Sequence, residues 1–203
     1  SCERPHGRVG ISEIVAHSCN VGVIETMKSV PREKLHETLK AFGFGMKTDS
    51  GIPGESGGIF RETAQWSGLS KYSISIGYEL SVTSLQMAAA FSAIANDGVY
   101  NSPVIIERVE NENGDVLRGF YPRSRGRVCQ EKTARLMMQL MRGAVTGGTA
   151  RAANIGYYTV VGKTGTSKKF SRQKGLYSDM SMSSFAGIAP LENPRICVYV
   201  VMD

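Results

Sequence analysis

The sequence lacks any long apolar stretch, and this argues against a membrane-spanning protein among its 203 residues. No run of 18 apolar residues occurs, so no segment has the composition of a membrane-spanning helix. The opening residues, Ser1 to His6, lack the apolar core of a signal peptide. Any export signal or membrane anchor is therefore expected upstream of residue 1.

Paired cysteines are also missing. The four cysteines, at positions 2, 19, 129 and 197, form no C-x-x-C pair, and no histidine follows them at a metal-binding spacing. Cys197 lies in an apolar run and is expected to be a small core residue. The sequence therefore predicts no metal site, no cofactor and no disulfide framework.

The basic residues give a formal net charge of +6 but no nucleic-acid signature. They are spread along the chain, and the densest group, Arg118 to Arg127, contains Gly119, Pro122 and Gly126 and is typical of a loop. No basic run is interleaved with aromatic residues, so nucleic-acid binding is not predicted.

The first part of the chain, residues 1–127, is expected to be a mostly helical lobe with a long irregular excursion. Apolar residues recur there at helical spacing, and the helix after Thr83 is apolar nearly all round, which indicates burial. Asn113-Gly114 is typical of a hairpin turn. The predicted elements are helices over 11–17, from Asn20, and from Pro31 to Gly43, an irregular excursion over 46–80 with one short strand, a helix over 84–96 and a strand over 103–109.

The second part, residues 128–203, is expected to hold one helix and three antiparallel strands. Short links between consecutive strands favour antiparallel pairing, and helices followed by such a sheet indicate the α+β class. The predicted strands cover 157–166, 182–189 and 196–202, and the predicted helix covers 130–145, with Ala134, Met137, Met138, Met141 and Val145 facing inward.

The strongest local motif is Lys163-Thr164-Gly165-Thr166, at the end of an apolar strand. A lysine charge and two hydroxyl groups suit recognition of a carboxylate, and glycine allows a substrate backbone to approach. The alternative is an ordinary solvated strand end. A phosphate-binding loop is disfavoured because five residues, not four, separate Gly156 from Gly162, and these residues favour a strand.

A second motif, Ser18-Cys19-Asn20, lies between the first two predicted helices. Its serine and asparagine can point to one side of the helix junction, or they can simply cap a helix, which both residue types favour. His17 is adjacent, but no Gly-x-Ser-x-Gly elbow surrounds any serine, so a Ser-His-Asp triad is not predicted.

In this order the two motifs resemble the S-x-N and K-T-G motifs of penicillin-binding proteins and serine β-lactamases. Ser18-Cys19-Asn20 matches the first, and Lys163-Thr164-Gly165, followed by Thr166 as in transpeptidases, matches the second. Other segments that resemble the class B enzymes are Phe42–Gly45 with Ile52–Glu55, Ser81–Ala90 with Ile94–Gly98, and Gly147–Ala150. The resemblance covers nearly the whole chain. It implies one incomplete transpeptidase domain over residues 1–203, with a penicillin-binding transpeptidase or serine β-lactamase-like fold.

The resemblance also implies a function for the parent protein, that of a peptidoglycan D,D-transpeptidase. Such an enzyme cross-links stem peptides through an acyl-serine intermediate and is a target of β-lactams. It implies a periplasmic domain, anchored to the bacterial inner membrane by an upstream segment, with division or elongation membrane proteins as further partners. An alternative is a relative that hydrolyses the acyl-enzyme, as a carboxypeptidase or β-lactamase does. Another is a binding or sensor module.

The site residues implied by the resemblance lie in the cleft expected between the helical lobe and the sheet. Ser18 would move protons, Asn20 would bind the donor amide, and Lys163 would set the local field and favour the donor carboxylate. The substrate-binding and oxyanion residues would be Thr164, Gly165 and Thr166, with both threonine hydroxyls on the carboxylate and the Thr166 backbone N–H at the oxyanion.

The family's nucleophile motif, S-x-x-K, is expected upstream of S-x-N, where this chain has only 17 residues. The one S-x-x-K pattern here is Ser171-Arg172-Gln173-Lys174, which follows K-T-G in a polar stretch and is interpreted as a coincidence. The chain alone is therefore expected to be inactive.

Overall fold

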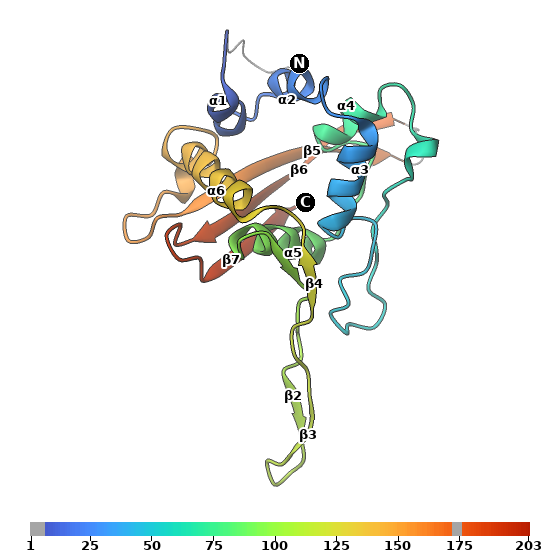
Figure 1. Cartoon of the computed structure of the whole chain (residues 1–203), viewed down its shortest axis with the longest axis vertical. Coiled ribbons are helices and arrows are strands. Elements are labelled where there is room, and N and C mark those ends of the chain that lie inside the picture. Colours follow the sequence, from blue (N-terminus) through green and yellow to red (C-terminus); the bar gives the residue numbers. More distant parts are fainter. Residues whose placement is uncertain (1–6, 172–175) are drawn as a thin grey trace.

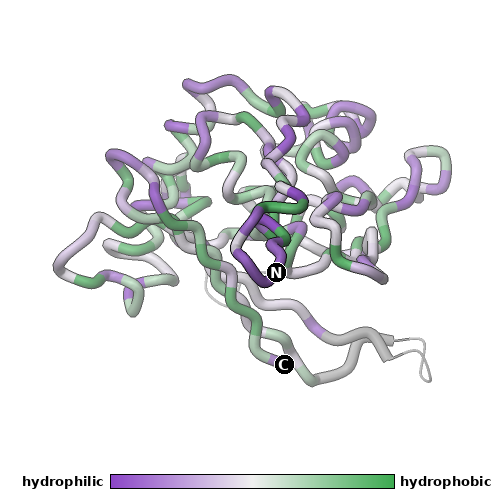
Figure 2. Tube along the Cα trace, turned by 90° about the horizontal axis from the view of Figure 1, so that it is seen from below, coloured by the Kyte–Doolittle hydropathy of each residue, from purple (hydrophilic) through white to green (hydrophobic). Residues whose placement is uncertain are grey.

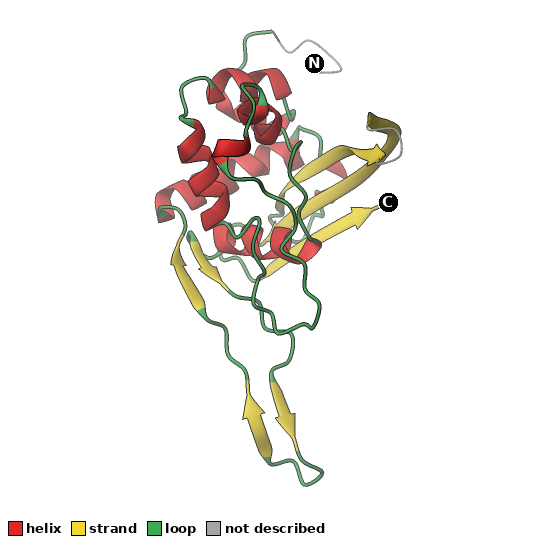
Figure 3. Cartoon of the chain, turned by 90° about the vertical axis from the view of Figure 1, so that its right-hand side faces the viewer, coloured by secondary structure: helices red, strands yellow, loops and turns green. Residues whose placement is uncertain are grey.

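The computed structural model describes residues 7–171 and 176–203 of the chain. Helices α5 and α6 pack against a three-stranded antiparallel sheet, and α1 packs against α6 (Figure 1). Figure 3 shows the helices on one side, the sheet on the other, and a long arm that reaches away from both. Segregated helices and antiparallel strands confirm the predicted α+β class.

The helices agree closely with the apolar periodicity of the sequence. The Thr83 hydroxyl caps α5 by accepting from the Gln86 N–H, and the Thr83 N–H donates to the Gln86 side-chain oxygen, which completes the capping box. Pro31 directly precedes α3 as its N-cap rather than forming its first turn. The helices are α1 (Ile11–Ala16), α2 (Asn20–Met27), α3 (Arg32–Ala41), α4 (Ser70–Ser75), α5 (Ser84–Ala95) and α6 (Glu131–Thr146), with short 3-10 helices η1 (Thr63–Gln65) and η2 (Arg151–Ala153).

Helix α4 and η1 lie in the excursion predicted to be irregular, so that prediction is wrong at these two places. Serine-rich α4 has little intrinsic helix propensity, and tertiary contacts stabilise it instead. Ile74 is buried, and the Ser70 hydroxyl donates to the Glu79 carboxylate across 2.7 Å. The predicted short strand is present only as a single bridge between Ile59 and Ser81.

The sheet comprises β5 (Val161–Ser171), β6 (Leu176–Ala189) and β7 (Ile196–Met202), paired antiparallel in the order β5-β6-β7. All three predicted strands are present, but the first begins at Val161 rather than Tyr157. Residues 157–160 favour a strand by composition, but β6 ends at Ala189 and the chain opposite them turns at Pro190. The pairing continues there through a backbone bond from the Leu191 N–H to the Thr159 carbonyl, across 2.9 Å. Tyr157 is 94% exposed.

The core lies between α5, α6 and the helix-facing side of the sheet. Met138 and Met141 of α6 contact Val161 and Ile188 of the sheet. The inward stripe predicted for α6 is correct except at Met137, which is 36% exposed. The buried positions 134, 138, 141 and 145 follow one another at spacings of four, three and four residues. Met137 lies beside this stripe and not in it.

A polar side chain fastens the irregular excursion to α5. Gln86 is fully buried, and its amide nitrogen donates to the carbonyl oxygens of Met46 and Gly57, each across 2.8 Å. The apolar character predicted for α5 therefore has one exception at its most buried position. The reason is that loop carbonyls removed from water need a donor.

The arm is a narrow antiparallel ribbon. Strand β1 (Val99–Asn101) pairs with β4 (Ser124–Arg127) at its base, and β2 (Arg108–Glu110) pairs with β3 (Val116–Gly119) near its tip. The strand predicted over 103–109 is wrong in extent, because Pro103 lacks the N–H that a continuous ladder needs. The predicted turn is confirmed, with Gly114 at a φ of +86°.

The basic group predicted to be a loop instead forms part of this arm. Its end anchors the arm to the body, since Arg125 donates to the Lys47 carbonyl across 2.8 Å and pairs with Asp49. Arg127 donates to the backbone oxygen of Asp97. These two arginines therefore form hydrogen bonds and an ion pair inside the protein.

Strand β7 forms one edge of the sheet and is largely apolar, as the green tube leading to the C-terminus shows in Figure 2. Four alternating side chains, Ile196, Val198, Val200 and Met202, are exposed on the same face. Cys197 points to the opposite face and packs against the core, as predicted. Among the helices of the described residues, none has the length and apolar composition needed to cross a membrane.

Candidate active site

The two sequence motifs meet through a hydrogen bond. Lys163 Nζ donates to Ser18 Oγ across 2.7 Å, although the residues are 145 positions apart in sequence. Ser18 lies in the turn between α1 and α2, and Lys163 lies near the start of β5. The same ammonium group also donates to the Thr164 carbonyl across 2.9 Å. The fold therefore brings the S-x-N and K-T-G motifs into direct contact.

Burial lowers the pKa of the Lys163 ammonium group below its usual value. Desolvation is the cause, and no carboxylate of the described residues offsets it. A lysine with a lowered pKa gives up its proton more readily near neutral pH. A hydroxyl group held 2.7 Å from such a lysine is well placed to exchange a proton with it.

Ser18 is held in an unusual backbone conformation. Its φ of +55° lies in the left-handed region, which non-glycine residues adopt infrequently. The helix cap that sequence alone would assign to Ser18 or Asn20 belongs instead to Cys19, whose Sγ accepts from the Gly22 N–H across 3.4 Å. The Ser18 hydroxyl is thereby left to Lys163.

The remaining predicted residues lie on both sides of this contact. Asn20 is the half-buried first residue of α2, and the described residues include no hydrogen-bond partner for its amide. Gly165 and Thr166 are exposed on β5. A Cβ at position 165 would lie 2.7 Å from Ser184 Oγ, so the neighbouring strand also favours glycine there.

Strand β5 is the other edge of the sheet within the described residues. An edge strand leaves alternate N–H and C=O groups unpaired along its outer side. An extended peptide can add to such an edge through backbone hydrogen bonds. The candidate site therefore combines an open strand edge with a lysine, two threonine hydroxyls and a serine.

Sequence analysis gave no role to Thr149, which also contacts the site. Its Oγ1 lies 2.7 Å from Thr164 Oγ1, and its backbone N–H donates to the Ala16 carbonyl across 3.1 Å. The available signal was the double glycine before it, at the end of a helix that precedes the K-T-G strand.

The Ser171–Lys174 pattern is not placed by the structure, because residues 172–175 are not described. In the described part of the chain, no group of three or more His, Cys, Asp or Glu side chains is arranged to hold a metal ion.

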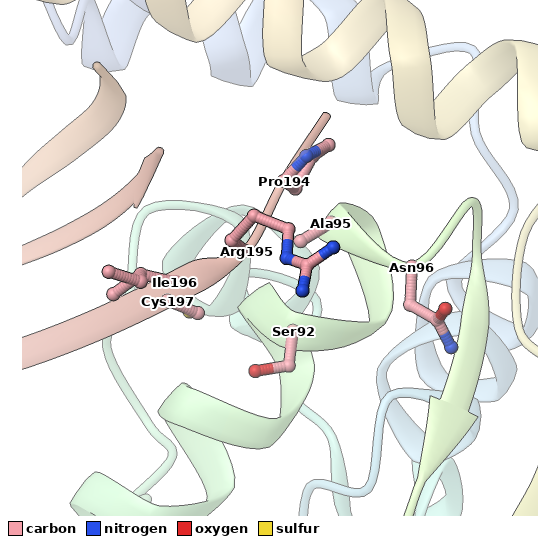
Figure 4. Close-up of a pocket in the computed structure, with 7 residues that line it drawn as sticks. All are labelled: Ser92, Ala95, Asn96, Pro194, Arg195, Ile196 and Cys197. Atoms are coloured by element: carbon pink, nitrogen blue, oxygen red, sulfur yellow. The ribbon is translucent and has the colours of Figure 1, made fainter. Parts of the chain in front are cut away.

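An open pocket of about 200 Å³ lies between the end of α5 and the start of β7 (Figure 4). Its lining includes none of the residues that sequence analysis proposed for chemistry. Its lining residues are Ser92, Ala95, Asn96, Pro194, Arg195, Ile196 and Cys197.

Comparison with known proteins shows the family in which these two motifs occur together. The family model described as "Penicillin binding protein transpeptidase domain" matches residues 2–203. The chain is 37% identical over 198 residues to penicillin-binding protein PbpB of Mycolicibacterium smegmatis, a match covering 94% of this chain and 30% of that protein. It is 31% identical over 199 residues to peptidoglycan D,D-transpeptidase FtsI of Escherichia coli, covering 98% of this chain and 32% of that protein. The chain thus spans about a third of the length of these relatives.

Solved structures give the same result. Penicillin binding protein 3 from Mycobacterium tuberculosis, complexed with aztreonam, is 34% identical and superposes with a TM-score of 0.92. That match covers 99% of this chain and 47% of the other. The complex of the same protein with ampicillin gives a TM-score of 0.93. The transpeptidase domain of penicillin-binding protein 3 from Burkholderia pseudomallei gives 0.85 at 29% identity, covering 59% of that chain. The predicted partial transpeptidase fold is confirmed.

Proposed function

This chain belongs to the penicillin-binding protein transpeptidase family, and we propose that it forms the C-terminal part of a peptidoglycan D,D-transpeptidase domain in a longer protein. The observation that carries the proposal is the 2.7 Å hydrogen bond from Lys163 to Ser18. That bond joins the two motifs across the fold and leaves a half-buried lysine of lowered pKa beside a hydroxyl group. Such a pair is suited to proton transfer during acyl transfer.

The proposed reaction needs a serine nucleophile from an S-x-x-K segment upstream of residue 1. Its Oγ attacks the penultimate D-alanine carbonyl, an ester bond forms, and the amide bond to the terminal D-alanine breaks. The serine proton passes to the leaving amine through the motif lysine and Ser18, with Lys163 tuning Ser18. An amine of a second stem peptide then attacks the ester carbonyl. The new amide bond forms, the ester bond to the serine breaks, and the amine's proton returns to the serine oxygen.

The donor peptide would lie along the outer edge of β5. Its terminal carboxylate would accept hydrogen bonds from the Thr164 and Thr166 hydroxyls, near the positive charge of Lys163. The Asn20 amide would bind the donor amide. The Thr166 N–H would form half of the oxyanion hole, and Gly165 would let the peptide backbone approach.

The setting proposed for the whole protein is the bacterial periplasm, with an upstream anchor in the inner membrane. Its ligands would be stem peptides and β-lactams, since related structures hold aztreonam and ampicillin. Division or elongation membrane proteins would be its partners. This chain by itself would not form an acyl-enzyme.

Intact mass spectrometry after benzylpenicillin treatment tests the proposal. We expect one added penicillin on an extended chain that begins upstream of S-x-x-K, and none on residues 1–203 alone. Lys163→Ala should slow acylation of the extended chain by roughly a hundredfold or more. Lys168→Ala, on the exposed part of the same strand, should leave the rate unchanged.

Each contrary outcome is informative. An adduct on residues 1–203 would place a nucleophile inside this chain. A folded extended chain that takes no adduct would overturn the enzyme proposal in favour of a binding module. Rapid release of penicillin together with stem-peptide hydrolysis, and no transfer to an acceptor amine, would indicate a carboxypeptidase or β-lactamase.

A further inference from the structure

We propose that Thr149 is a positioning residue, which fixes the direction of the Thr164 hydroxyl and ties the S-x-N turn to the K-T-G strand. The inference rests on the proposed function, in which Thr164 binds the donor carboxylate. Thr149 contacts both parts of the site through different groups. Its backbone bonds to the segment before Ser18, and its side chain bonds to Thr164.

The backbone contact places the loop directly against α1. The Thr149 N–H donates to the Ala16 carbonyl across 3.1 Å, two residues before Ser18. A Cβ at Gly148 would lie 2.1 Å from that same carbonyl oxygen, so only glycine allows this approach. The spacing between the S-x-N turn and residues 147–150 is therefore fixed by backbone contacts.

The loop is also firmly attached to the end of α6. Gly148 and Ala150 both donate to the Ala144 carbonyl, across 3.2 and 2.9 Å. Ala150 is buried against Ala144 and Val145. A residue between two such anchors has little freedom, so its hydroxyl group has a defined place relative to β5.

The side-chain contact has a direction once a carboxylate is bound. The Oγ1 atoms of Thr149 and Thr164 are 2.7 Å apart, and each hydroxyl has a single proton. An ionised carboxylate can only accept hydrogen bonds, so Thr164 must donate its proton to the ligand. Thr149 must then donate to Thr164. Thr149 would thus hold the Thr164 proton toward the carboxylate without touching the ligand itself.

The test compares two substitutions in the extended chain. Thr149→Val keeps the shape and the backbone N–H but removes the hydroxyl, whereas Thr149→Ser keeps the hydroxyl. We expect Thr149→Val to lower the second-order rate of acylation by benzylpenicillin roughly fivefold, and Thr149→Ser to stay within about twofold of the parent. Thr146→Val is the matched control, because in the described part of the chain Thr146 Oγ1 bonds to the Arg142 and Gly143 carbonyls, both within α6.

A second ligand separates positioning from a general structural effect. The methyl ester of benzylpenicillin replaces the charged carboxylate with a weaker, neutral acceptor, so Thr149→Val should slow its acylation by a clearly smaller factor than it slows acylation by the acid. Equal losses with the acid and the ester, or no loss with the acid, would overturn the inference. Absence of acylation in the parent extended chain would instead overturn the proposed function, so the two failures are distinguishable.

Discussion

At the scale of single residues, Ser18 and Cys19 of the Ser18-Cys19-Asn20 motif make different contacts. The middle residue, which the S-x-N pattern leaves open, caps α2 and is buried. Its neighbour Ser18 takes the left-handed conformation that aims its hydroxyl at Lys163. A positive φ at a non-glycine residue raises the energy of the backbone. Such a conformation persists where the surrounding structure holds the residue in place.

Lys163 makes stability depend on pH in a defined direction. Its pKa is lowered in the folded chain, whereas the unfolded chain keeps the usual value of about 10.4. Between these two values the unfolded state binds more protons, so stability rises with pH across that window and is lowest below the folded pKa. The free energy of unfolding of the parent chain, relative to Lys163→Met, should therefore increase as the pH rises toward the unfolded value of about 10.4.

Urea unfolding of both chains at several pH values measures this difference. Every other titratable group is shared by the pair, so the subtraction isolates Lys163. A difference that stays constant across the range would show that burial does not perturb this lysine.

At the scale of elements, helices with an apolar stripe were predictable, and elements held by tertiary contacts were not. α1, α2, α3, α5 and α6 follow from periodicity and caps, because each has apolar residues at helical spacing. α4 depends on contacts distant in sequence, and the start of β5 depends on where β6 ends. Neither fact is contained in a local window of sequence.

The buried amide of Gln86 gives an element-scale prediction. Gln86→Leu removes the donor to the carbonyls of Met46 and Gly57, which are partly buried, and of Gly43, which is buried. We expect a loss of roughly 3 kcal/mol or more in the free energy of unfolding, measured by urea denaturation. Gln139→Leu, at an exposed position of α6, should change it by less than about 0.5 kcal/mol. Equal effects of the two changes would show that the excursion is not held by this amide.

At the scale of the whole molecule, the site is made from segments near opposite ends of the chain. The family resemblance predicted that Ser18 and Lys163 lie in one site, because both motifs and their order can be read from the sequence. It did not supply Thr149, whose contact depends on how closely Gly148 approaches Ala16. Distances of this kind arise only when three elements pack together, so sequence patterns alone do not reveal them.

The arm is the part of the molecule that the proposed chemistry does not need. Strands β2 and β3 pair with each other and have no substantial contact with any other described element. Their apolar residues, such as Val116 and Leu117, are exposed rather than packed. Replacing residues 105–120 of the extended chain with an Asn-Gly turn should therefore change the free energy of unfolding by less than about 0.5 kcal/mol and leave penicillin acylation unchanged.

The arm's base explains why the cut is placed there. Ser102 bonds to the Arg123 carbonyl, and Arg125 anchors β4 to the body, so both contacts remain after the replacement. Urea unfolding and the acylation rate are measured on the same preparation. If the shortened chain keeps its stability but loses acylation, the arm must influence the site through a route other than folding. If it loses stability, the outer ribbon supports the body despite its exposed position.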